Sequence, residues 1–124
     1  TRAEPRSTRI RDLSSHTLEI VRSGLRRVVE DPLGTGYKRI RLSEVAIAGK
    51  TGTAEVGGDL EDHAWFAGYV PADRPRLAFV IVLEHAGSGG RQAGPVARQL
   101  VQSMHANGLI GPATKVSLSD NPSR

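Results

Sequence analysis

The 124-residue chain contains no cysteine, only one Trp, two Tyr and two Phe, and no long apolar run. The absence of cysteine excludes disulfides and thiolate metal sites. The longest apolar stretch, residues 77–83, has the length of a strand, so we find neither a signal peptide nor a transmembrane segment. A chain of this length forms one domain or part of one.

The chain carries a formal net charge of +4 and has a pI near 10.1. A basic balance is typical of proteins that bind nucleic acids or membrane surfaces. The arginines are not interleaved with aromatic residues, however, and no nucleic-acid-binding motif accompanies them. We therefore interpret them as solvated helix faces and expect no nucleic-acid partner. Because His16, His85 and His105 lack the spacing of a metal cluster, we expect no metal and no cofactor.

The most informative stretch is residues 48–55, Ala-Gly-Lys-Thr-Gly-Thr-Ala-Glu. The apolar run before it, residues 45–48, predicts a buried strand that leads directly into Lys50. Because side chains alternate along a strand, Lys50 and Gly52 are expected on one face and Thr51 and Thr53 on the other, with Gly52 leaving room beside the ammonium. This pattern predicts a strand edge that binds an extended, anionic ligand. A glycine-rich hairpin with an exposed lysine remains the alternative.

A phosphate-binding P-loop is a further alternative, because Gly49-Lys50-Thr51 matches the end of that motif. The motif also needs a glycine five residues before Gly49, where this chain has Glu44. It needs a helix after Thr51, which the following glycines oppose. The sequence therefore disfavours a P-loop.

The first part of the chain predicts a lead-in and one helix. Residues 1–13 are polar and Arg-rich, which is typical of an extended lead-in. Ser14 or Ser15 can cap a helix that ends at Asp31-Pro32. Gly24 inside this helix predicts close packing against a neighbour. The apolar residues of the helix share one face: Leu18, Val21, Leu25, Val28 and Val29.

The remainder predicts strands followed by a second helix. Residues 37–42 suggest a short ribbon or loop. After the Lys-Thr-Gly strand come a turn at residues 55–61, a return strand at 63–70 and a strand at 77–84. Short connections favour antiparallel pairing. The last strand is apolar on both faces, which predicts a sheet covered on both sides. A glycine loop at 86–90 precedes a helix from Pro95 to Asn107-Gly108. Residues 111–124 predict a disordered tail.

These segments together carry a resemblance. Residues 48–55, the strand His-Ala-Trp-Phe-Ala-Gly-Tyr-Val-Pro at 63–71, the apolar strand, the loop at 87–90 and the helix entry at 95–98 resemble the C-terminal segment of a penicillin-binding protein transpeptidase domain. They are most similar to the class B, monofunctional branch. Lys-Thr-Gly is one of the motifs of this enzyme class. The resemblance implies an α+β fold, the C-terminal part of the β-lactamase/transpeptidase-like fold, with a three-stranded antiparallel sheet packed against helices and the domain segment at residues 14–110.

The resemblance also implies a site. Lys50 would supply positive charge beside the serine of Ser-x-Asn, and Thr51 and Thr53 would hydrogen-bond a terminal carboxylate next to Gly52. The backbone N–H of Thr53 would be one of two oxyanion-hole donors. The implied substrates are the D-Ala-D-Ala end of a peptidoglycan stem peptide and β-lactams, which the serine of Ser-x-x-Lys attacks.

The chain departs from the family pattern in its nucleophile. No serine is followed three residues later by lysine, and Thr35-Gly-Tyr-Lys38 only imitates that spacing. Ser119-Asp120-Asn121 spells the second motif but follows Lys-Thr-Gly, whereas the family has it before, so we interpret it as coincidence. We therefore expect a fragment, inactive alone, of a longer enzyme that has a membrane anchor and works on the extracytoplasmic or periplasmic face.

Three further expectations follow. The edge of the strand at 77–83 should be unpaired, so that the missing N-terminal half or a second copy covers it. His63 should cap or pack at the start of its strand, and Trp65 and Phe66 should both pack in the core. A serine β-lactamase, or a non-catalytic β-lactam sensor or divisome binding module, would share the fold and stays an alternative.

Overall fold

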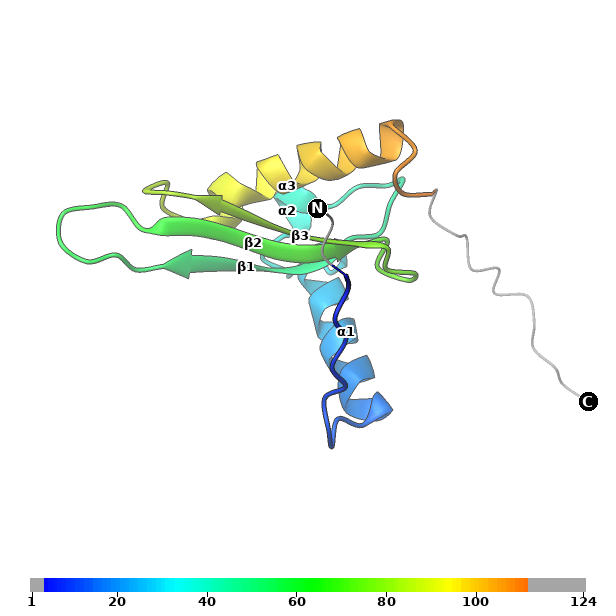
Figure 1. Cartoon of the computed structure of the whole chain (residues 1–124). Coiled ribbons are helices and arrows are strands. Elements are labelled where there is room, and N and C mark those ends of the chain that lie inside the picture. Colours follow the sequence, from blue (N-terminus) through cyan, green and yellow to red (C-terminus); the bar gives the residue numbers. More distant parts are fainter. Residues whose placement is uncertain (1–3, 112–124) are drawn as a thin grey trace, which may run out of the picture.

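The computed structural model describes residues 4–111. Figure 1 shows a three-stranded sheet with one long helix lying along one face and another helix projecting from the opposite side. The sheet is antiparallel with the strand order β1-β2-β3. The elements are α1 (Ser15–Glu30), α2 (Tyr37–Ile40), β1 (Ala48–Ala54), β2 (His63–Val70), β3 (Leu77–Leu83) and α3 (Gly89–Ala106).

Helix α1 begins and ends as predicted. The Ser14 hydroxyl accepts a hydrogen bond from the Thr17 N–H at 3.0 Å, which caps the first turn, and the helix stops before Asp31. The predicted close packing at Gly24 is wrong, because a Cβ placed there would meet nothing within 4 Å. The reason is visible in Figure 1, where most of α1 projects away from the sheet.

Residues 37–40 form the helical turn α2, so the expected ribbon or loop is wrong. Packing decides this segment, because Ile40 is fully buried and lies against α3 at Gly94. The predicted strand at 45–48 is also too early. Strand β1 starts at Ala48, although Val45 and Ile47 still contribute fully buried side chains to the core. The apolar run before Ala48 therefore reflects burial in the core and not strand structure.

The core lies between the sheet and α3. Phe66 is fully buried, as predicted, and Ala93, Ala97 and Val101 of α3 cover it and its neighbours. Gly49 makes room for the Phe66 ring, since a Cβ at that position would lie 2.5 Å from the ring's Cζ. This close approach fixes β1 against β2 directly beside Lys50.

The opposite face of the sheet is open in the described residues, so the prediction of a sheet covered on both sides is wrong here. Val80 is 59% exposed, Val82 41% and Trp65 38%. Trp65 therefore does not pack in the core. Strand β3 is an edge strand with one unpaired side, as expected.

Helix α3 starts at Gly89, six residues before the predicted start at Pro95. Proline is accommodated in its second turn, where its missing N–H removes the bond to the Arg91 carbonyl. The predicted end is confirmed, with Asn107 as the C-cap and Gly108 at φ 69°. The predicted tail, apart from Gly111, lies outside the described residues. Within residues 4–111, no helix is long and apolar enough to cross a membrane.

Candidate functional site

Lys50 lies on β1, at the edge of the sheet. Its Nζ donates a hydrogen bond to the carbonyl oxygen of Thr51 at 2.8 Å, so that carbonyl faces the open side of β1. In an antiparallel ladder, the N–H and C=O of one residue point the same way, and residues two apart share that direction. The N–H of Thr53 therefore also faces the open edge. An unpaired N–H on an edge strand can bond a ligand.

The two threonines of β1 lie on the face of the sheet that α3 covers. Thr51 Oγ1 lies 2.9 Å from the hydroxyl of Thr35, and Thr53 Oγ1 accepts a hydrogen bond from the N–H of Gly89 at 3.2 Å. Lys50 alternates to the other face, as predicted, but its side chain folds back until Nζ is 3.5 Å from Thr51 Oγ1. One cation and two hydroxyls therefore converge on one edge.

Gly52 serves a different purpose from the predicted one. A Cβ at Gly52 would meet the Cβ of Trp65 at 3.3 Å, and no atom of Lys50 within 4 Å. The glycine therefore leaves room for the neighbouring strand rather than for the ammonium. The expectation that Gly52 makes space beside Lys50 is wrong in this structure.

The converging groups line a groove of about 420 Å³. Two arginines, Arg39 from α2 and Arg91 from the first turn of α3, add positive charge to that of Lys50. Among the described residues that line it there is no carboxylate; they are Thr35, Arg39, Lys50, Thr51, Gly52, Thr53, Ser88, Gly90 and Arg91. Such a surface attracts anions.

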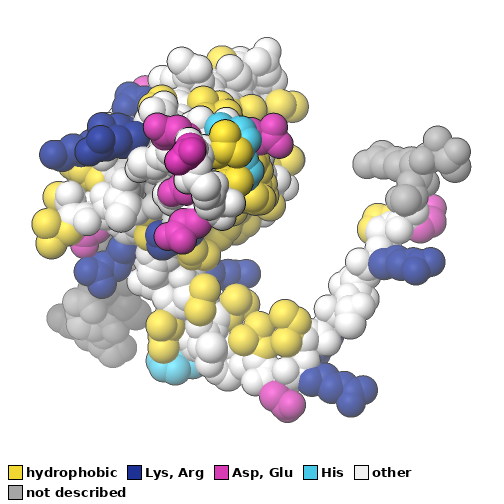
Figure 2. All heavy atoms as spheres, turned by 90° about the vertical axis from the view of Figure 1, so that its left-hand side faces the viewer, with side chains coloured by type: hydrophobic (Ala, Val, Ile, Leu, Met, Phe, Trp, Pro, Cys, Tyr) yellow, Lys and Arg dark blue, Asp and Glu magenta, His cyan; other side chains and the backbone are white. Residues whose placement is uncertain are grey.

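Acidic side chains gather instead at the connection between β1 and β2. Figure 2 shows them over the tip of this hairpin, with Lys and Arg side chains to one side. Glu61, Asp59 and Asp62 line a separate hollow beyond Thr53. The charge of the surface therefore changes sign along β1, from positive at Lys50 to negative past its end.

The loop after α1 brings Thr35 to the groove. The Asp31 carboxylate accepts a hydrogen bond from the Leu33 N–H at 2.9 Å and one from the Arg27 guanidinium at 3.2 Å. Both bonds hold the pKa of Asp31 below its ordinary value, and the bond from the Leu33 backbone has the larger effect. At Gly34 a Cβ would clash with the Val28 carbonyl, so the loop needs a glycine there.

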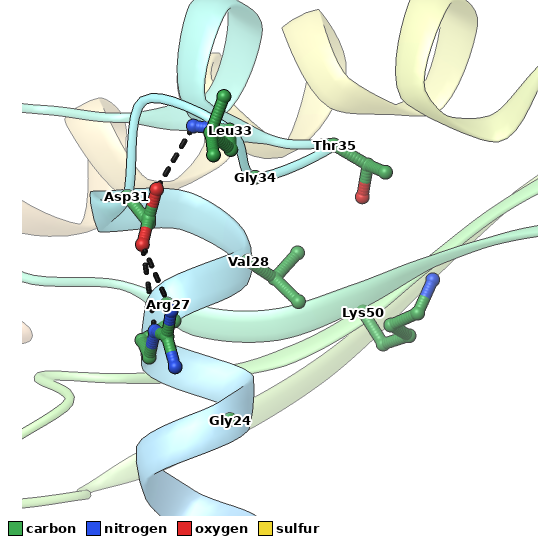
Figure 3. A pocket seen from close by; sticks show the side chains of 8 residues that line it. All are labelled: Gly24, Arg27, Val28, Asp31, Leu33, Gly34, Thr35 and Lys50. Carbon is green, nitrogen blue, oxygen red and sulfur yellow. Dashed lines mark hydrogen bonds and ion pairs between the residues drawn. The ribbon is translucent and has the colours of Figure 1, made fainter.

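A second hollow of about 360 Å³ lies between this loop and β1. Figure 3 shows Thr35 and Lys50 to the right of the helix that carries Arg27, with the Thr35 hydroxyl pointing down and the Lys50 ammonium pointing up. The sequence presented Thr35 only as an imitation of a nucleophile motif. The glycines on both sides of Thr35 indicate a tight turn, in which the backbone fixes the position of the hydroxyl.

His63 lies outside the groove and packs as expected. Its Nδ1 accepts a hydrogen bond from the N–H of His85 at 3.0 Å, and the two rings lie 4.7 Å apart. The predicted glycine loop is partly helical, since Gly89 and Gly90 form the start of α3. A Cβ at Gly89 would clash with the Gly52 carbonyl and lie 2.7 Å from the Trp65 carbonyl oxygen. Only glycine lets the helix start this close to β1.

The strand edge with Lys-Thr-Gly-Thr, under a C-terminal helix on a three-stranded antiparallel sheet, defines the C-terminal part of the β-lactamase/transpeptidase-like fold. The sequence model of the family described as "Penicillin binding protein transpeptidase domain" matches residues 2–102. The chain belongs to this family. The match begins within residues 1–13, the expected lead-in.

Relatives and solved structures agree with this assignment. The "Peptidoglycan D,D-transpeptidase MrdA" of Haemophilus influenzae is 36% identical over 97 residues, which are 67% of this chain and 15% of the relative. The crystal structure of Pseudomonas aeruginosa PBP2 in complex with WCK 5153 matches with a TM-score of 0.68 and 33% identity, over 82% of this chain and 23% of that chain.

A further structure, the complex between penicillin-binding protein PBP2 and MreC from Helicobacter pylori, matches with a TM-score of 0.68 and 30% identity. It covers 79% of this chain and 19% of the other. The chain thus spans about a fifth or less of the relatives' length, from 15% for the Haemophilus protein to 20% for that of Escherichia coli.

Proposed function

We propose that this chain is the part of a serine-type peptidoglycan D,D-transpeptidase that binds the substrate's terminal carboxylate. The observation that carries the proposal is the convergence of Lys50, Thr51 and Thr53 on the open edge of β1. A D-Ala-D-Ala stem peptide ends in a carboxylate, and a penicillin carries one at the corresponding position. Hydrogen bonds from hydroxyls to an ionised acceptor are about twice as strong as neutral ones.

The same edge supplies the electrostatic part of acyl transfer. The N–H of Thr53 faces the open side of β1, where it can donate to the oxygen of a tetrahedral intermediate. The ammonium of Lys50 lies beside the same edge and stabilises negative charge that develops there. The catalytic serine must come from another segment, because the chain has no Ser-x-x-Lys. The chain alone is therefore proposed to be inactive.

The wider context belongs to the same proposal. Residues 14–110 form the C-terminal part of a transpeptidase domain, between a lead-in at 1–13 and a tail at 111–124. The partners are the N-terminal half of the enzyme, the stem peptide and β-lactams. The relatives' role in peptidoglycan synthesis supports a location on the extracytoplasmic face of the membrane, with an anchor in the longer protein.

Labelling with a fluorescent penicillin tests this function. The longer protein, which joins this chain to a segment with Ser-x-x-Lys and Ser-x-Asn, should form a stable covalent adduct, and the isolated chain should form none. An adduct that hydrolyses within seconds would indicate a serine β-lactamase instead. A correctly folded longer protein that forms no adduct would contradict the transpeptidase function and favour a binding module.

The open face of the sheet yields a prediction about the rest of the enzyme. Val80 is 59% exposed here, and with Val82 and Trp65 it forms an apolar patch that the N-terminal half should cover. Val80→Asp should therefore destabilise the longer enzyme by roughly 2–4 kcal/mol, because it buries an unpaired charge. The same change should reduce self-association of the isolated chain. Denaturation curves and analytical ultracentrifugation measure the two effects; a longer enzyme of unchanged stability would show that this face stays exposed.

A further inference from the structure

The two threonines of β1 hold their hydroxyls in different ways. Thr53 Oγ1 receives the N–H of Gly89, which can only donate, so the proton of Thr53 remains available for another partner. Thr51 Oγ1 lies 2.9 Å from the hydroxyl of Thr35, and either oxygen can be the donor of that bond. The direction of this second bond decides whether Thr51 can donate to an anion.

A hydroxyl has one proton and two lone pairs, whereas a carboxylate only accepts. If Thr51 donates to Thr35, it has no proton left for a substrate carboxylate. If Thr35 donates, the proton of Thr51 is free. The ammonium of Lys50, 3.5 Å from Thr51 Oγ1, is also purely a donor and takes one lone pair of that oxygen, which leaves the other lone pair to accept from Thr35.

We propose that Thr35 is a positioning residue: its hydroxyl donates to Thr51 Oγ1 and thereby directs the Thr51 proton toward the substrate's carboxylate. Thr35 thus does for Thr51 what the N–H of Gly89 does for Thr53. Both hydroxyls then present their protons to one anion in the groove. The inference rests on the proposed function of the groove and adds a residue from outside the Lys-Thr-Gly strand.

The backbone around Thr35 fits this role. The Asp31 carboxylate binds the N–H of Leu33, and the N–H of Gly36 donates to the Val28 carbonyl at 2.9 Å, so the loop is held on both sides of Thr35. A hydroxyl on a fixed loop loses little freedom when it orders a second one. Thr35 itself is exposed at the groove rather than packed in the core.

The test compares two ligands in the longer enzyme, a penicillin and its methyl ester, which lacks the carboxylate charge. Thr35→Val should slow acylation by the free acid by about tenfold, since one oriented hydrogen bond to an ion is weakened. Acylation by the ester should change by less than about twofold, because a neutral ester oxygen accepts a much weaker hydrogen bond than a carboxylate. Thr35→Ser, which keeps the hydroxyl, should restore the preference for the acid.

Thr17→Val is the matched control, because it also removes a hydroxyl that is paired with another one. Thr17 Oγ1 lies 2.8 Å from Ser14 Oγ, at the start of α1 and far from the groove. It should leave both rates as they are. An equal loss for acid and ester in Thr35→Val, or no loss at all, overturns the positioning role. If Lys50→Ala still collapses acylation in that case, the proposed function stands and only this inference fails. If the unsubstituted enzyme forms no adduct, both fail.

Discussion

Replacing Lys50 by alanine should lower the rate at which penicillin acylates the longer enzyme by about 100- to 1,000-fold, the usual effect of removing one preorganised electrostatic group. The ammonium lies 3.5 Å from the Thr51 hydroxyl oxygen and donates a hydrogen bond to the Thr51 carbonyl on the open strand edge. Its loss removes charge stabilisation of the carboxylate and of the transition state together. Stopped-flow acylation with a fluorescent penicillin measures the rate.

Lys38→Ala is the matched control, because Lys38 is an exposed lysine on α2 that does not line the groove. It should be acylated at the unaltered rate. A Lys50→Ala enzyme that reacts as fast as the control would remove Lys50 from the site, whatever its position on the strand. A loss in both variants would point to the net charge of the surface instead.

Replacing Phe66 by alanine should destabilise the transpeptidase domain by about 3–5 kcal/mol, as is typical for a large aromatic side chain in a core. Phe66 is fully buried, and its ring centroid lies 5.8 Å from that of Phe79 on the neighbouring strand. The substitution would leave a cavity under α3 and beside Gly49. Strand β1 cannot collapse far enough to fill it. Urea denaturation of the longer enzyme measures the change.

Val96→Ala provides the comparison, since Val96 lies on α3 but is 39% exposed. Its effect should stay within roughly 0.5 kcal/mol. Similar losses at Phe66 and Val96 would contradict the assignment of the core to the inner face of α3. The buried face of the helix is formed instead by Ala93, Ala97 and Val101.

The strands were predictable because their signals are local. Residues 63–70 and 77–83 carry apolar and aromatic side chains, and the glycines at 57 and 58 adopt the positive φ that the connecting turn requires. Two of the segments that were predicted wrongly depend on distant contacts. Ile40 makes α2 helical by packing against α3, and Gly89 starts α3 early because it fits against the Gly52 carbonyl. A single sequence does not reveal such contacts.

The candidate site also combines features that the sequence predicts locally with features that depend on distant contacts. The alternation along β1 placed Lys50 and the two threonines correctly relative to the strand. The folding back of Lys50 toward Thr51, and the partners Thr35 and Gly89, depend on loops that lie 16 and 36 residues from their threonines. Sequence patterns do not predict these pairs, because the residues meet only when the sheet and α3 assemble.

The most direct test of the account is the crystal structure of the longer enzyme acylated by a penicillin. We expect the carboxylate of the bound penicillin to lie within about 3 Å of Thr51 Oγ1 and Thr53 Oγ1, with the Lys50 ammonium beside it. The acyl carbonyl oxygen should accept a hydrogen bond from the backbone N–H of Thr53. A carboxylate bound away from β1, or a Lys50 side chain turned out of the groove, would contradict the account.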